Sequence, residues 1–123
     1  MINYFLRVVK EQGESIALII ENKSYTYNDL FKSAQTIASE LNRKVEPSGL
    51  VGVYTDNNFY TYASILGVLI SGRGFVPLNS KFPETRLNHS IMQTEIQVVV
   101  CCEKSIESVN KFASHIEMGP ADR

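Results

Sequence analysis

Two short groups of residues have the types or spacing that could support chemistry. Gly72-Arg73-Gly74 begins like a dinucleotide-binding loop. It lacks a third glycine, however, and it follows a predicted helix rather than a strand, so we do not expect it to bind a dinucleotide. Cys101 and Cys102 are thiols that could bind a metal. Because consecutive residues of a strand point to opposite faces, the two thiols cannot hold one ion, and we expect both to be inert and buried.

The two histidines are weak candidates for catalysis. His89 and His115 are far apart in the sequence, and no Ser or Cys motif lies beside either of them. His89 comes three residues after Arg86 on a predicted helix, where a solvent-exposed face is the simpler interpretation.

The end of the predicted strand at 50–54 is a better place for a ligand. Open α/β sheets bind ligands at the carboxyl ends of their strands, which is where Asp56 lies. Asp56 also suits a cap for the following helix, and we favour that interpretation. Tyr54 and Tyr60 could line a pocket, although aromatic residues beside a sheet usually belong to the core.

The composition favours one globular domain in a reducing cytoplasm. The chain has 123 residues, of which 44% are hydrophobic, and its 13 acidic residues nearly balance its 12 basic ones. Without a basic stripe, we do not expect nucleic-acid binding. The adjacent cysteines do not form a disulfide framework. The uncharged segment Asn57 to Gly72 is too short to span a membrane, and the charges at Arg7, Lys10 and Glu11 exclude a secretory signal.

The first half of the chain predicts a helix, a hairpin and a second helix. Ile2, Phe5, Leu6 and Val9 share one side of an opening helix that Gly13 can end. Strands are predicted at Ser15 to Glu21 and Ser24 to Thr26, joined by a turn at Asn22-Lys23. Thr26 and Asp29 have the spacing of a capping box, which opens a helix reaching Val45.

From Leu50 onward, strands and helices alternate, which predicts an α/β fold with a mostly parallel sheet flanked by helices. Strands are expected at Leu50 to Tyr54, at Phe75-Val76 (closed by Pro77) and at Gln97 to Cys102. Helices are expected at Phe59 to Ser71, from Pro83, and at Glu103 to His115. Gly67 indicates close packing against another backbone, and Gly72 a left-handed helix end. Residues 1–116 form the domain, and Glu117 to Arg123 are expected to be a disordered tail.

The stretch Leu69 to Arg86 resembles a core motif of the adenylate-forming enzymes, the superfamily of acyl-CoA synthetases and nonribosomal peptide adenylation domains. The motif reads Leu-Lys-Ala-Gly-x-Ala-Tyr-Val-Pro-Leu-Asp-Pro-x-Tyr-Pro-x-x-Arg. The identical positions are Leu69, Gly72, Val76, Pro77, Leu78, Pro83 and Arg86. Close replacements are Phe75, Asn79 and Phe82, and the departures are Ser71, Gly74 and Ser80.

An earlier segment resembles another core motif of the same family, Leu-[Thr/Ser]-Tyr-x-Glu-Leu. Thr26, Tyr27 and Leu30 match it, while Tyr25 replaces Leu and Asp29 replaces Glu. A capping box alone is common, but its place ahead of the second motif fits the family. The resemblance therefore implies the N-terminal part of an AMP-binding enzyme.

The resemblance implies chemistry that lies outside this chain. The family activates a carboxylate, here expected to be an amino acid, with ATP and Mg²⁺, and passes the acyl group to the thiol of a carrier protein or CoA. Its Ser/Thr-Gly-rich phosphate loop, magnesium-binding Thr-Glu pair, ribose-binding Asp and C-terminal lysine have no counterpart here. No catalytic, cofactor-binding or metal-binding residue can be carried over, so we expect the chain alone to be inactive and its partner to be the remainder of the parent enzyme.

Two other functions stay open at this stage. A partial fold leaves apolar surface exposed, so the chain could be a self-associating interaction module, which would dimerise or aggregate. An unrelated flavodoxin-like binding domain would instead bind phosphate or flavin at the strand ends near Asp56 and Pro77. Oligomeric state tests the first alternative, and calorimetric titration with Mg-ATP tests the expectation that the nucleotide chemistry lies outside this chain.

Overall fold

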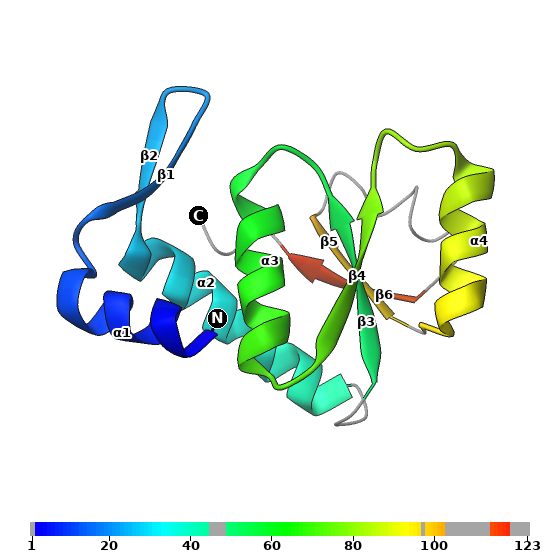
Figure 1. The fold of residues 1–123 in the computed structure, drawn as a ribbon, viewed down its shortest axis with the longest axis horizontal. Coiled ribbons are helices and arrows are strands. Elements are labelled where there is room, and N and C mark those ends of the chain that lie inside the picture. Colours follow the sequence, from blue (N-terminus) through cyan, green and yellow to red (C-terminus); the bar gives the residue numbers. More distant parts are fainter. Residues whose placement is uncertain (1, 45–48, 97, 103–113, 119–123) are drawn as a thin grey trace.

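A computed structural model describes residues 2–44, 49–96, 98–102 and 114–118, in which helices and strands follow one another as Figure 1 shows. The N-terminal elements are α1 (Ile2–Gln12), β1 (Ile16–Ile20), β2 (Lys23–Thr26) and α2 (Tyr27–Lys44). The remaining elements are β3 (Leu50–Thr55), α3 (Phe59–Ile70), β4 (Gly74–Asn79), α4 (Glu84–Thr94), β5 (Val98–Cys102) and β6 (Ser114–Met118). No helix in these described ranges is long and apolar enough to cross a membrane.

The four C-terminal strands form one parallel sheet in the order β4-β3-β5-β6. From β3 the chain passes through α3 to β4 on one side, and from β4 it passes through α4 to β5 on the other side of β3. Right-handed crossovers in opposite directions place their helices on opposite faces. Figure 1 shows this arrangement, with α3 and α4 on either side of the sheet. The predicted fold class is confirmed.

Each face of the sheet has its own hydrophobic core. Side chains alternate along the strands, so β3 directs Val51 and Val53 toward α2 and α3, together with Val100 of β5. On the opposite face, Val99 and Cys101 pack with Leu78 and with the buried residues of and after α4. Those residues are Leu87, Ile91 and Ile96. Strands covered on both faces explain the nearly continuous apolar runs in the sequence.

The N-terminal hairpin forms as predicted, but its turn lies one residue earlier. Ile20 pairs with Lys23, so the two turn residues are Glu21 and Asn22 rather than Asn22 and Lys23. Their φ angles are 50° and 67°, and two consecutive positive φ values are the signature of the tight turn that fits the twist of a hairpin. Asn tolerates this conformation better than most residues, whereas Glu gives no sequence signal for it.

Helices α2 and α3 pack closely where Gly67 faces α2. A Cβ atom at Gly67 would lie 2.7 Å from Ile37 Cβ and 2.8 Å from the Ala34 carbonyl oxygen. This confirms the predicted close packing. Gly72 has a φ of 83° directly after the α3 cap, which confirms the predicted left-handed helix end.

Two predicted boundaries in the second half are wrong. Pro77 does not close its strand, because β4 continues to Asn79 with Pro77 opposite Val53. Since β4 is the outer strand of the sheet as described, alternate residues need no ladder donor and proline is tolerated there. Pro83 precedes α4 as its N-cap residue, with a ψ of 148°, rather than starting the helix.

The C-terminal prediction fails where β6 pairs with β5. The helix expected at Glu103 to His115 lies outside the described residues up to position 113, but Ser114 and His115 belong to β6. Likewise, Glu117 and Met118, which were expected in the tail, are paired with Cys101 and Cys102 of β5, while residues 119–123 lie outside the described ranges. At Ser114 and His115, pairing with β5 takes precedence over the helical periodicity. Gln97, expected to start β5, is likewise not described.

Candidate functional site

An open hollow of about 300 Å³ lies at the carboxyl ends of β3 and β4. It is lined by Thr55, Asp56, Asn57, Thr61, Tyr62, Asn79 and Ser80. These residues come from the ends of the two strands, the loop after each of them and the first turn of α3. The position is the one at which open α/β sheets bind ligands. The strand-end hollow, as we call it, is therefore the first candidate site.

Backbone pairing fixes the shape of this hollow. Thr55 lies opposite Asn79 in the parallel register, and the Ser80 amide donates to the Thr55 carbonyl oxygen at 3.0 Å. The Asn79 side-chain oxygen accepts from the Lys81 amide at 2.9 Å, which turns the chain away from the sheet. Asn79 and Ser80 were noted in the sequence only as motif positions. If the predicted strand had been extended to Asn79, both residues would have been expected at the sheet edge that carries Asp56.

Asp56 lies in the strand-end hollow, as the sequence suggested, but it is not the side-chain cap of α3. That cap is Asn58, whose side-chain oxygen accepts from the Thr61 amide at 3.1 Å. The Asp56 carboxylate accepts from the amide of Asn57 at 2.9 Å. Its backbone is tied to the Thr61 hydroxyl, which accepts from the Asp56 amide at 2.9 Å and donates to its carbonyl oxygen at 2.7 Å.

The charges of the strand-end hollow do not suit a nucleotide triphosphate. Among the lining residues that the structure describes, Asp56 is the one carboxylate, and none is Lys or Arg. A triphosphate would meet a negative side chain without a cation to balance its own charges. The lining of this hollow therefore offers no cation to hold the phosphates of ATP, and we assign it no chemical step that uses ATP. Hydroxyl and amide groups at this edge can hydrogen-bond a neutral polar group.

The aromatic and thiol candidates lie in the core. Tyr54 and Tyr60 are half-buried and line, with Cys101, a recess that leaves no room for a water molecule. Cys101 is 2% exposed, which confirms the prediction of a buried thiol. The side chain of Cys102 lies outside the described set. Tyr54 thus fills space at this point, whereas Tyr60 also lines a second hollow beside the hairpin, as the sequence suggested for a pocket.

Gly72-Arg73-Gly74 is a structural connection between α3 and β4. Arg73 is 5% exposed, and its guanidinium donates to the Asn42 side-chain oxygen at 2.9 Å. This hydrogen bond ties the connection between α3 and β4 to the C-terminal end of α2. Gly74 starts β4, where a Cβ would lie 2.9 Å from Leu50 Cδ2. The triplet shows no phosphate cradle.

The two histidines lie on different elements of the fold. His89 is exposed on α4, as predicted, and His115 belongs to β6. Within residues 2–44, 49–96, 98–102 and 114–118, no three His, Cys, Asp or Glu side chains are grouped to hold a metal ion. The exposed Arg86 guanidinium lies 3.9 Å from the centre of the Phe82 ring, a cation–π contact between two motif positions.

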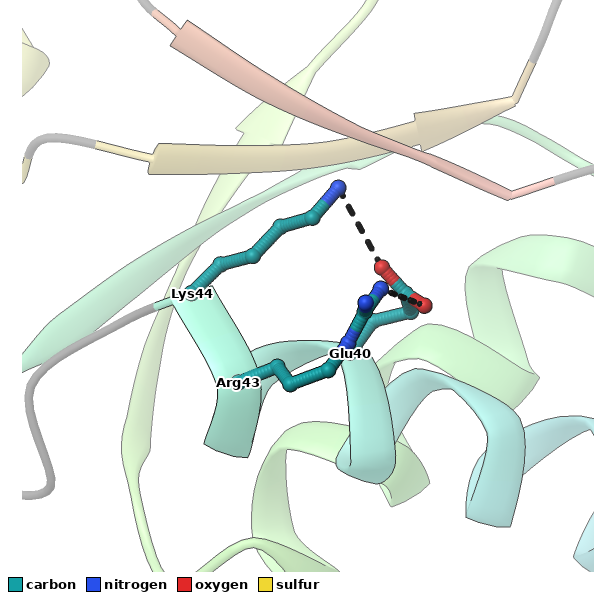
Figure 2. Close-up of polar contacts among 3 residues, drawn as sticks. All are labelled: Glu40, Arg43 and Lys44. Carbon is teal, nitrogen blue, oxygen red and sulfur yellow. Dashed lines mark hydrogen bonds and ion pairs between the residues drawn. The ribbon is translucent and has the colours of Figure 1, made fainter.

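A charged cluster at the end of α2 is an ordinary surface feature. Figure 2 shows Arg43 and Lys44 both reaching Glu40, with the Lys44 ammonium 3.2 Å from the carboxylate. The hydrogen bond from Lys44, followed by that from Arg43, holds the pKa of Glu40 below its usual range. The cations lie at the helix C-terminus, where the helix dipole favours them. The cluster supports the helix and has no reactive partner among the described residues.

Comparison with protein families matches residues 5–121 to the model of the AMP-binding enzyme family. Relatives include tyrocidine synthase 3 of Brevibacillus parabrevis, which is 30% identical over 105 residues, covering 81% of this chain and 2% of that protein. The nonribosomal peptide synthetase dtxS1 of Metarhizium robertsii is 38% identical over 88 residues, covering 71% of this chain and 1% of that protein. The chain spans between 1% and 10% of the length of the first curated relatives.

Solved structures agree on the fold. The four-domain nonribosomal peptide synthetase AB3403, crystallised with AMP and glycine, has a TM-score of 0.84 at 26% identity, covering 94% of this chain and 9% of that one. The peptide synthetase FmoA3 has a TM-score of 0.86 at 20% identity, covering 95% of this chain and 14% of that one. The two sequence motifs, the doubly wound sheet and the match over residues 5–121 lead to one conclusion: the chain belongs to the AMP-binding enzyme family, as an N-terminal part of an adenylate-forming enzyme related to peptide-synthetase adenylation domains.

Proposed function

We propose that this chain is the structural opening of an adenylation domain that activates an amino acid with ATP, and that it has no activity alone. The family match over residues 5–121 carries this proposal. The complete enzyme would join the carboxylate to AMP with release of pyrophosphate and then transfer the acyl group to a thiol, on a carrier protein or on CoA.

The structural contacts of the motif residues support the proposal that the chain alone has no activity. Thr26 and Asp29 hydrogen-bond each other at the start of α2, and Gly72 reverses the chain after α3. Arg86 lies over Phe82. Each of these groups has a structural contact within the chain, which is the role that the proposal gives to the motif residues. What the chain contributes is a sheet and a helical layer on which the rest of the domain can be built.

A domain exchange tests the proposal directly. Residues 2–118 replace the matching segment of the peptide synthetase AB3403, and amino-acid-dependent exchange of pyrophosphate into ATP is measured. We expect the 123-residue chain to give no exchange and the folded chimera to retain it with the amino acid preference of the parent. A folded but inactive chimera would contradict the structural role, and exchange by the chain alone would contradict its inactivity.

Self-association is a second candidate function, favoured by apolar side chains on the surface. Ile16 and Ile19 of β1 are 56% and 66% exposed, and Met92 of α4 is 72% exposed. Sedimentation velocity over a range of concentrations tests this second function. A reversible dimer that is lost in the Ile19→Lys variant would support an interaction module, whereas a monomer at all concentrations would exclude it.

A further inference from the structure

A second hollow lies between the hairpin, the first two turns of α2 and the first turn of α3. Its volume is about 310 Å³, at the lower end of the range for small-molecule sites. The lining residues are Lys23, Ser24, Tyr25, Asp29, Lys32, Phe59 and Tyr60. In Figure 1 the elements that supply them are β2, α2 and α3. We call this the aromatic hollow.

Three rings form one wall of the aromatic hollow. Tyr25 of β2 stacks on Phe59 of α3 with ring centres 4.4 Å apart and planes 26° from parallel. Tyr60 meets Phe59 edge to face at 5.5 Å and 81°. Phe59 is 7% exposed, so it anchors the wall, while Tyr25 and Tyr60 are half-buried and keep part of their surface toward the hollow. Such a wall can receive another planar ring by stacking or edge contact.

The rim of the aromatic hollow is positively charged. Lys23 and Lys32 are both lining residues and lie on opposite elements, β2 and α2, and the Lys23 ammonium is 5.3 Å from the centre of the Tyr25 ring. The one acid in the lining, Asp29, is committed to the helix cap through the Thr26 amide at 2.8 Å. Two ammonium groups against one carboxylate leave an excess of positive charge beside the rings.

We propose that the aromatic hollow binds a small aromatic anion, with its ring on the tyrosine wall and its charge between Lys23 and Lys32. It is separate from the strand-end hollow, because the first turn of α3 divides the two. Tyr60 lines the aromatic hollow, and Thr61 and Tyr62 line the strand-end hollow. The proposal does not depend on adenylation activity, and its test contains no ATP.

Nuclear magnetic resonance titration of the ¹⁵N-labelled chain tests the proposal with four probes at constant ionic strength. Benzoate and phenyl phosphate carry both ring and charge, inorganic phosphate carries charge only, and benzyl alcohol carries a ring only. We expect saturable shifts of the amides of 23–25, 32, 59 and 60 with one or both aryl anions, and roughly tenfold weaker binding of the other two. The tighter aryl anion identifies carboxylate or phosphate as the preferred group.

Lysine substitutions provide a matched comparison, because they keep the fold and the aliphatic stem. The double variant Lys23→Met with Lys32→Met should weaken the aryl anion roughly tenfold. A control with Lys10→Met and Lys81→Met removes the same charge from exposed positions outside the hollow and should bind as the original chain does. Non-saturating or scattered shifts, equal binding of inorganic and phenyl phosphate, or unchanged binding by the first double variant would each overturn the proposal.

Discussion

Thr26 and Asp29 cap α2 by exchanging hydrogen bonds. The Thr26 amide donates to Asp29 Oδ2 at 2.8 Å, and the Asp29 amide donates to the Thr26 hydroxyl oxygen at 3.1 Å. Both residues belong to the family motif that spans Tyr25 to Leu30, so this motif marks the start of a helix here. The same helix carries Ile37 against α3, whose first turn lines the strand-end hollow. The cap therefore starts the helix against which α3 packs.

Removing either partner should destabilise the chain. Thr26→Ala or Asp29→Ala leaves an amide at the helix end without its side-chain acceptor, at a cost of about 1 kcal/mol each. Urea denaturation followed by circular dichroism measures the loss. Thr36→Ala is the control, because the Thr36 hydroxyl only donates to the Lys32 carbonyl oxygen within α2 and alanine favours a helix. An equal loss in the control would show that the cap has no special role.

Gly67→Ala should also destabilise, although alanine is the better helix former by about 1 kcal/mol. The added methyl would lie 2.7 Å from Ile37 Cβ and 2.8 Å from the Ala34 carbonyl oxygen, and neither can move without shifting α2. Overpacking of this kind costs about 1–3 kcal/mol, so the net effect is a loss. A denaturation midpoint that rises in Gly67→Ala would disprove the close contact between α2 and α3.

Substitution of Gly72 should also destabilise the chain, but through backbone strain rather than steric overlap. No atom lies within 4 Å of a Cβ built at Gly72, but its φ is 83°. Gly72→Ala therefore meets only backbone strain, about 1–2 kcal/mol, and Gly72→Asn should cost clearly less because asparagine tolerates the left-handed region. Comparing the free energies of unfolding of the two variants separates strain from steric overlap. Equal losses in both would indicate that the side chain meets an obstacle.

The Glu40 cluster predicts a small pH dependence of stability. The hydrogen bonds from Lys44 and Arg43 lower the pKa of Glu40 in the folded chain, so its contribution is present above its ordinary pKa of 4.5 and is lost as the pH falls through the lowered value. Glu40→Gln should be slightly less stable than the original chain at pH 7, and the difference should vanish in acid and shrink in high salt. Thermal unfolding at several pH values checks this, and a difference that persists in acid would point to another cause.

The sequence predicted the elements whose signals are local. The Thr26–Asp29 cap and the helix end at Gly72 depend on neighbouring residues or on one special conformation, and a glycine inside an apolar helix is by itself the signal for the close contact at Gly67; all three are confirmed. Asp56 was likewise placed correctly at a strand end, because that position follows from the apolar run before it.

The failures arose where distant residues decide the outcome. Proline ended the expected strand at Pro77, yet an outer strand tolerates it, so β4 reaches Asn79 and brings Asn79 and Ser80 beside Asp56. His115 was assigned to a helix by periodicity, but pairing with Val99 of β5 makes it part of a strand. The aromatic hollow was missed because β2, α2 and α3 meet only in the folded chain.

Tyr25 and Phe59 should be energetically coupled across the hairpin and α3. Their stacked rings, with centres 4.4 Å apart, predict a coupling of about 0.5–1.5 kcal/mol in a double-mutant cycle with Tyr25→Ala and Phe59→Ala. Met92→Ala replaces Tyr25→Ala in the control cycle, because Met92 is exposed on α4 and should add independently to Phe59→Ala. A two-stranded hairpin is marginal alone, so this contact should contribute to holding β2 against α3. No coupling in the first cycle would mean that the aromatic wall does not form in solution.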